Sequence, residues 1–162
     1  MKICIVSQTF APQPEGGAEI VCRQLAQSLS GAHEVVVLSL GMTGNALAPP
    51  GEIISNAPYR LWRLPFHNSQ LPSVGQLQMS WGGKLIWHLR SAIGAVAPAD
   101  IRAFLKKEAF DLIYAHNAVR MQPALYKVAA EIGLPVVQHL HDYALLCART
   151  TMFDHDRNCT VP

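Results

Sequence analysis

The stretch KICIVSQTFAPQPEGGAEIVCRQLAQSLSGAHEVVVLSL, residues 2–40, decides the predicted fold. It opens with a short apolar run, Lys2–Val6, that is rich in β-branched residues and typical of a buried strand. Residues 7–17 carry two prolines and two glycines and therefore predict a loop. Residues 18–30 repeat apolar side chains at helical spacing, and Gly31 is expected to end that helix as its C-cap. Residues 34–40 predict a second buried strand, so the stretch is a βαβ unit and implies a parallel sheet.

The rest of the chain continues the alternation of strands and helices. Strands are expected at residues 59–66, nearer the sheet edge, at 111–115 and at 135–140. Helices are expected at 76–96, 97–109 and 118–132, the last of them ended by Gly133, and the pattern fades into a loop after Tyr143. The sequence therefore predicts an α/β fold with a Rossmann-like, doubly wound, mostly parallel sheet. Ligands of such sheets bind at the carboxyl ends of the strands, and the candidate residues do follow the first, fourth and fifth predicted strands.

Composition narrows the class of protein. The chain has 162 residues, half of them hydrophobic, which suits one domain with a proper core. Charged residues make up 15%, below the usual quarter, and this suits a chain that buries surface against a partner domain. The net charge of +2 indicates no particular partner, and the lack of any Lys/Arg run argues against nucleic acid. No apolar stretch spans a bilayer and no signal peptide precedes the first strand, so we expect a cytoplasmic protein with reduced cysteines.

The first candidate site is the loop that ends in Gly16, Gly17 and Glu19 at the start of the first helix. Two glycines let a ligand approach the backbone closely, and a helix N-terminus offers free N–H groups to a phosphate or a sugar hydroxyl. A tight turn without a ligand is an equally good interpretation of the glycine pair. The chain has neither G-x-G-x-x-G nor an acidic residue after the second strand, and it lacks G-x-x-x-x-G-K-[ST]. These absences exclude an NAD domain and a P-loop NTPase.

Histidines follow the fourth and fifth predicted strands. His116 and Asn117 could contact a substrate, with His116 able to move a proton, although a helix cap or loop packing is the simpler role for a lone histidine. At the end of the fifth strand, His141, Asp142 and Tyr143 lie where the sheet should meet its ligand crevice. If that strand continues through His141, alternation places it on the same side as His139. We interpret this segment as a substrate contact in which His141 and Asp142 have base character.

Two further features have competing interpretations. A group of candidate metal ligands falls late in the chain, but its spacings match no zinc template, so a metal is less favoured than substrate contact. The group comprises His139, His141, Asp142, Cys147, His155 and Cys159. The second feature is the predicted helix that carries Trp81, Lys84, Trp87 and Arg90. Its basic face is sparse, which favours an ordinary core-facing helix with a solvated edge over the alternative, peripheral contact with a membrane.

The residues resemble those of a known enzyme family. The first strand, the Pro-containing loop and Gly16-Gly17-Ala18-Glu19 are similar to the opening of GT4 glycosyltransferases. Asp111-Leu-Ile-Tyr-Ala-His116 and Pro135-Val-Val-Gln-His-Leu-His141-Asp142-Tyr143, followed by Leu146-Cys147, also resemble this family. The resemblance covers nearly the whole chain, residues 1–162, in the right order and at the right spacing.

The resemblance implies a GT-B fold, in which two Rossmann-like domains face each other across a cleft. This chain would be the N-terminal, acceptor-side domain of a retaining enzyme that uses a nucleotide-sugar donor, a sugar or lipid-linked acceptor and usually no metal ion or other cofactor. Gly16 and Gly17 would approach the donor diphosphate or the acceptor, and Glu19 would orient their loop. His141 with Asp142, and then His116, would lie near the transferred sugar. Polysaccharide synthesis is the process implied.

The sequence departs from the family in one respect. GT4 enzymes carry a Glu-x7-Glu pair on the donor-binding domain, and no two glutamates here have that spacing. We therefore expect the donor domain to be absent, the N-terminal domain to be incomplete at its C-terminus and the chain alone to be inactive, as part of a longer protein or of a split gene. The alternatives are a non-catalytic Rossmann-like binding or interaction module and a metal-dependent hydrolase that uses His139, His141 and Asp142.

Overall fold

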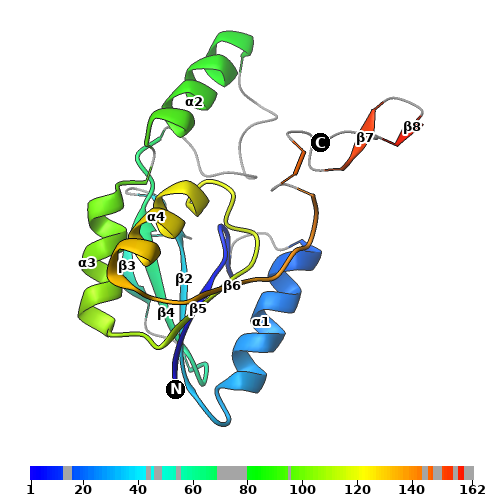
Figure 1. The fold of residues 1–162 in the computed structure, drawn as a ribbon. Helices are drawn as coiled ribbons and strands as arrows, with labels where there is room; N and C mark the ends of the chain where they lie inside the picture. Colours follow the sequence, from blue (N-terminus) through cyan, green and yellow to red (C-terminus); the bar gives the residue numbers. More distant parts are fainter. Residues whose placement is uncertain are drawn as a thin grey trace.

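The computed structural model confirms an α/β fold built on a six-stranded sheet (Figure 1). It describes residues 1–12, 16–42, 45, 49–53, 56–68, 80–94, 96–143, 146–147, 151–154 and 157–158. The strands are β1 (Lys2–Val6), β2 (Glu34–Gly41), β3 (Gly51–Ile53), β4 (Arg60–Pro65), β5 (Leu112–Ala115) and β6 (Val136–Gln138). Their order is β3-β4-β2-β1-β5-β6, and all neighbouring pairs are parallel except β3 with β4.

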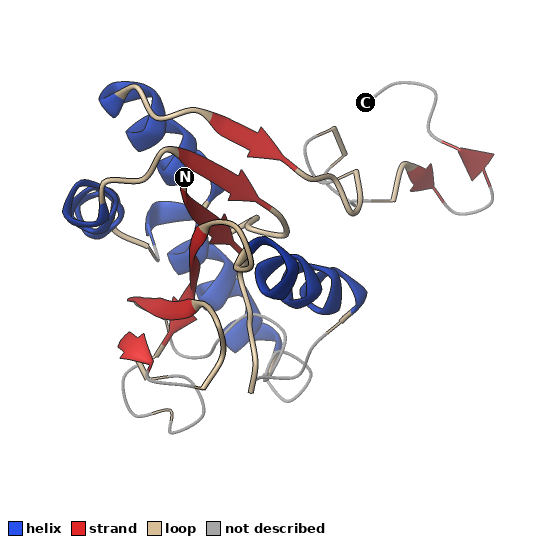
Figure 2. Ribbon diagram, turned by 90° about the horizontal axis from the view of Figure 1, so that it is seen from below, coloured by secondary structure: helices blue, strands red, loops and turns tan. Residues whose placement is uncertain are grey.

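Helices cover both faces of the sheet. They are α1 (Gly17–Leu29), α2 (Trp81–Gly94), α3 (Pro98–Glu108) and α4 (Gln122–Ile132). Helix α1 lies on one face, α3 and α4 lie on the other, and α2 stands beyond the carboxyl ends of the strands (Figures 1 and 2). The order of strands reverses between β1 and β5, because β2 lies on one side of β1 and β5 on the other. A doubly wound sheet binds ligands at such a switch point.

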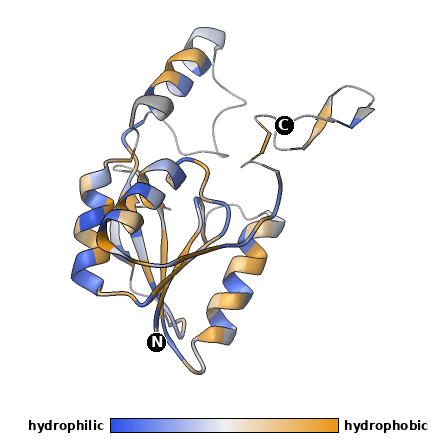
Figure 3. Cartoon of the chain, in the orientation of Figure 1, coloured by the Kyte–Doolittle hydropathy of each residue, from blue (hydrophilic) through white to orange (hydrophobic). Residues whose placement is uncertain are grey.

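The sheet separates two apolar cores. On the α1 face, Ile5, Val37 and Leu61 pack with Cys22 and Ala26 of the helix. On the opposite face, alternate residues of the same strands pack against α3, α4 and Trp87 of α2. Because successive strand residues point to opposite faces, membership of one core or the other shows which face of the sheet a strand residue points to. The hydropathy colouring shows the apolar strands in the centre of the domain (Figure 3).

The predicted elements are confirmed in order and type, with differences at their ends. Helix α4 begins at Gln122 rather than at residue 118, since residues 118–121 form a turn and Pro123 suits the first helical turn. Gly133 ends α4 in the left-handed conformation, as predicted. The prediction for Gly31 is wrong, because α1 ends at a right-handed Ser30 whose hydroxyl donates to the Ala26 carbonyl at 2.6 Å.

Three short strands were not expected. Strand β3 covers the outer edge of β4, so the strand predicted near the edge lies second from it. A separate pair, β7 (Phe153–Asp154) and β8 (Arg157–Asn158), forms a small hairpin where a loop was predicted. The first four residues of the predicted helix at 76–96 lie outside the described residues, and the described part begins at Trp81.

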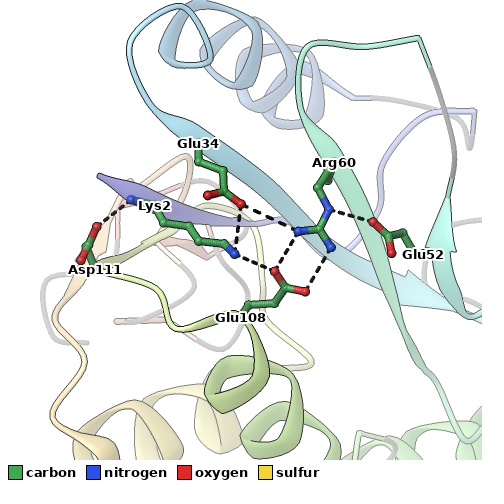
Figure 4. Close-up of polar contacts among 6 residues, drawn as sticks. All are labelled: Lys2, Glu34, Glu52, Arg60, Glu108 and Asp111. Carbon is green, nitrogen blue, oxygen red and sulfur yellow. Dashed lines mark hydrogen bonds and ion pairs between the residues drawn. The ribbon is translucent and has the colours of Figure 1, made fainter.

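An ion-pair network ties the amino-terminal ends of the strands together (Figure 4). Glu108, at the end of α3, accepts hydrogen bonds from both terminal nitrogens of Arg60 at 2.8 and 3.1 Å and from Lys2 Nζ at 2.8 Å. Arg60 also pairs with Glu52, and Lys2 with Glu34. The network joins four strands to α3 at the edge opposite the candidate site, so its role is structural.

Candidate functional site

The loops that follow β1 and β5 meet at the switch point of the sheet. The Gln8 backbone N–H donates to the Asn117 carbonyl at 2.6 Å, and the Arg120 backbone N–H donates to the Gln8 side chain at 3.2 Å. His116 follows β5 directly, and its backbone N–H donates to the Val6 carbonyl at 2.9 Å. The two loops are therefore fixed to each other where a ligand of this fold binds.

Glu19 holds the glycine loop in place. Its buried carboxylate accepts hydrogen bonds from the Gly16 N–H at 3.0 Å, from Thr9 Oγ1 at 3.1 Å and from Asn117 Nδ2 at 3.4 Å. The first bond is the glutamate half of a capping box, and glycine supplies no side chain for the other half. Glu19 thus joins the start of α1 to the loops after β1 and β5, and its oxygens are occupied by these contacts.

Three histidines form a stacked cluster at the carboxyl ends of β5 and β6. His116 Nδ1 lies 2.9 Å from His141 Nε2, and the rings of His139 and His141 stack with centroids 4.4 Å apart and planes 4° apart. The His116 ring stacks on both of the others. The sequence prediction placed His139 and His141 on the same side on the condition that the strand continues through His141. Strand β6 ends at Gln138, before His139, so the two rings stack although the strand does not continue.

Burial favours the neutral form of two of the three histidines, His116 and His141. His116 is only 1% exposed, and this burial, with the nearby His139 and His141, lowers its pKa to about 4. Burial also lowers the pKa of His141, although that residue is exposed on one side. A neutral imidazole offers one N–H and one lone pair, so His141 can donate a hydrogen bond to a hydroxyl or accept one from it.

Gln138 fixes the backbone that carries the histidines. Its side-chain amide donates to the carbonyls of His116 and His139, both at 2.9 Å, and its oxygen accepts from the Tyr126 hydroxyl. Tyr114 adds a contact between its hydroxyl and His139 Nδ1 at 3.1 Å. Sequence reasoning missed Gln138, whose only signal was an amide inside an otherwise apolar strand segment.

The cluster is not arranged for a metal ion. One candidate nitrogen from each histidine lies within 4.8 Å of the others, so His116, His139 and His141 could in principle hold a metal. Lone pairs of imidazoles lie in the ring plane, and those of the nearly parallel His139 and His141 rings do not converge on one point. A ring would have to rotate to bind an ion. The structure brings together only part of the group of candidate metal ligands that the sequence suggested. Cys147 lies outside the three histidines, and His155 and Cys159 lie outside the described residues.

Asp142 and Tyr143 border an open hollow beside the cluster. The hollow is lined by Leu140, His141, Asp142, Tyr143 and Leu146. Tyr143 is 53% exposed, Leu140 60% and Leu146 57%, so the hollow has one polar wall and an unusually open apolar rim. Asn117 and Gln122 line a second, smaller hollow with the three histidines. The structure thus gathers His116, Asn117, His141, Asp142 and Tyr143 at one edge, with Gly16, Gly17 and Glu19 at the start of α1.

The helix α2 presents a mixed surface. Trp87 is buried in the core, but Trp81 is 81% exposed, and Lys84 and Arg90 are also exposed. Leu85, Ile86 and Leu89 are each about half exposed, which is more apolar exposure than the predicted core-facing helix would have. Among the described residues, no helix is both long and apolar enough to cross a membrane.

Comparisons with known proteins bear on the family and the fold of the chain. The family model for the glycosyl transferase 4-like domain matches residues 16–157. No curated relative matches the chain. Among solved structures, the sucrose-phosphate synthase of Thermosynechococcus elongatus aligns with a TM-score of 0.57 and 16% identity, covering 90% of this chain and 34% of that one. The C-terminal domain of a hydrogenase from Pyrococcus furiosus also aligns, with a TM-score of 0.48 and 16% identity over 85% of this chain and 90% of that one. The chain therefore spans about a third of the synthase chain it matches.

Proposed function

Because the chain belongs to the glycosyl transferase 4-like family, we propose that it is the acceptor-binding part of a retaining glycosyltransferase. The transferred sugar comes from a nucleotide-sugar donor, and the acceptor is a sugar or a lipid-linked sugar. Polysaccharide synthesis in the cytoplasm is the setting that this family implies. The observation that carries the proposal is the convergence of the β1, β5 and β6 ends on one histidine-lined edge.

Each site residue has a role in this proposal. The exposed imidazole of His141, in contact with His116, accepts a proton or a hydrogen bond from a sugar hydroxyl near the transferred sugar. Asp142 lies next to His141 in the open hollow, and the two side chains together act as the base. Asn117 and Tyr143 contact the acceptor from either side of the histidines, and Gly16 and Gly17 bring the start of α1 close to a substrate. Glu19 acts on substrate binding through the glycine loop that it orients.

A second domain completes the site. The apolar side chains around the hollow give the second domain a surface on which to pack, and they lie at the edge where the cleft of a two-domain transferase opens. They are Leu140, Tyr143 and Leu146. This domain supplies the groups that stabilise the leaving diphosphate, which is a large share of catalysis, so the chain alone is inactive. Peripheral membrane contact through α2 is consistent with a lipid-linked acceptor, because its exposed face combines Trp81 and Leu89 with Lys84 and Arg90.

The experiment is a calorimetric titration with a panel of nucleotide-sugars, UDP and GDP. It is made on this chain and on the chain together with the sequence that follows Pro162 in its gene. Binding and donor hydrolysis only in the longer protein support the proposal, and a Glu-x7-Glu segment in that sequence supports it independently. In the longer protein, His141→Ala should abolish transfer, whereas His67→Ala, at an exposed histidine outside the cluster, should not. A stop codon after Pro162, or no nucleotide binding by either protein, opposes the proposal.

A non-catalytic binding module is the second candidate. The exposed apolar rim of Leu140, Tyr143 and Leu146 favours it, since such a surface also fits a partner chain. This candidate predicts self-association that hides the rim together with no affinity for any nucleotide-sugar. Sedimentation of the wild type and of Leu140→Ser distinguishes the two candidates. If the rim is a self-association surface, the wild type forms an oligomer and the variant does not.

A further inference from the structure

The sheet contains a line of buried polar atoms that lack hydrogen-bond partners within the part of the chain that the structure describes. Five polar side-chain atoms in the described part of the chain are buried without a hydrogen bond, and four of them belong to neighbouring strand ends. The four, called here the polar row, are Arg63 Nε, Ser39 Oγ, Ser7 Oγ and His116 Nε2. Each unpartnered buried polar group costs free energy, so four of them side by side call for a common explanation.

Strand register places these residues next to one another. Ser39 of β2 is the direct partner of Arg63 in β4. Ser7 follows β1, and its backbone N–H donates to the Leu38 carbonyl at 3.0 Å, which sets it beside Ser39. His116 follows β5 next to Ser7 in the same way, through its bond to Val6. The polar row therefore crosses four adjacent strands at one level, near their carboxyl ends.

All four side chains face α1. In each strand the residue two positions earlier belongs to the apolar core under that helix: Leu61, Val37 and Ile5 for the first three, and Tyr114, which packs against the same core, for His116. Alternation then puts the polar row on this face. Helix α1 starts at the same edge of the sheet, and its N-terminus adds partial positive charge there (Figure 1).

Arg63 gives the row its chemistry. The residue is 1% exposed, and its Nη2 donates to the Ala11 carbonyl at 2.7 Å. No ion pair of Arg63 occurs within the described residues, and burial lowers its pKa. A buried guanidinium without a carboxylate is costly unless an anion accompanies it, and its planar donors suit a phosphate group. Neither sequence motifs nor the histidine cluster had pointed to this residue.

We propose that the polar row binds a phosphate group, free or esterified, between Arg63 and the hydroxyls of Ser39 and Ser7. Adjacent strands lie about 4.8 Å apart, a spacing that two oxygens of one phosphate can bridge. The phosphate takes the place of the Ala11 carbonyl as acceptor of the Arg63 hydrogen bond, so the Ala11 carbonyl moves when it enters. His116 Nε2, at the other end of the row, contacts the remainder of an esterified ligand. Phosphate binding here requires neither sugar transfer nor a second domain, although the row shares His116 with the proposed sugar site.

The test is a calorimetric titration of the chain with inorganic phosphate and with glycerol phosphate, at constant ionic strength in chloride. The wild type should bind, and Arg63→Met should weaken binding roughly 10- to 100-fold, since it removes charge-assisted hydrogen bonds. Ser39→Ala should weaken it roughly 2- to 10-fold. Arg102→Met, which removes an exposed arginine of α3, serves as the matched control and should leave binding unchanged. If glycerol phosphate binds more tightly than inorganic phosphate, the ligand of the site is a phosphate ester. If the two bind equally, the ligand is free phosphate.

Folding effects do not obscure the result. Ser39→Ala and Ser7→Ala delete hydroxyls that have no hydrogen-bond partner among the described residues, so both variants should be at least as stable as the wild type without phosphate. They report on the site even if Arg63→Met does not fold. Absence of heat with the wild type, or equal phosphate affinity in the wild type and both serine variants, would overturn the proposal and leave water as the occupant of the row.

Discussion

Glu108→Gln tests whether the network at the amino-terminal edge stabilises the fold. Arg60 and Lys2 lower the pKa of the Glu108 carboxyl from 4.5 to about 2. Each pKa unit corresponds to about 1.4 kcal/mol, so the interaction corresponds to about 3 kcal/mol. Arg60 has 39% of its side chain exposed and is partly screened by solvent, which reduces our expectation to about 2 kcal/mol. Glu108→Gln should lower the free energy of unfolding by this amount at pH 7.

The pH dependence gives the sharper check. Because the folded pKa is depressed, the stabilisation is present above the unfolded pKa of about 4.5 and is lost as the pH falls towards about 2. Urea unfolding followed by tryptophan fluorescence should show a difference between wild type and Glu108→Gln that is large at pH 7 and small near pH 2.5. Glu131→Gln, at an exposed ion pair with Arg102, should have little effect at either pH. A difference of the same size at both values would refute the electrostatic reasoning.

Two further predictions concern the candidate site. A Cβ at Gly16 would lie 3.0 Å from the Glu19 carboxylate, whereas one at Gly17 meets nothing within 4 Å. Gly16→Ala should therefore cost about 1 kcal/mol in thermal unfolding and Gly17→Ala should be neutral or slightly stabilising, and equal losses would contradict the packing. His116, with a pKa of about 4, should stay neutral in an NMR titration down to about pH 5, and stability should fall between about pH 6.5 and 4 because only the unfolded chain gains the proton there. A His116 midpoint near 6.5 would show that its ring is not buried as described.

The strongest local patterns predicted the elements well. Strand β1 matches its predicted residues, and Gly133 ends α4 in the left-handed conformation that glycine adopts without strain. The three-residue β3 was missed because its stability comes from antiparallel pairing with β4, which local sequence does not reveal. The small hairpin β7–β8 was missed for the same reason.

Part of the site could be found from sequence, and part depended on register. The histidines were predicted because polar residues directly after buried strands stand out. Their stacking was not predictable, since it depends on how β6 aligns with β5 and on the Gln138 amide that fixes both ends. The polar row was hidden for a similar reason, because Arg63 and Ser39 are far apart in sequence and become neighbours only through strand pairing.

The most direct test of the proposed substrate site is to follow the imidazole NMR signals of the seven histidines of this chain, together with any sequence that follows Pro162 in its gene, while a nucleotide-sugar and its acceptor are added. We expect the signals of His116, His139 and His141 to shift together and those of His33 and His67, which lie outside the cluster, to stay in place. Ligand binding that leaves the three cluster signals unchanged would contradict the claim that the substrate site lies at the carboxyl ends of β5 and β6.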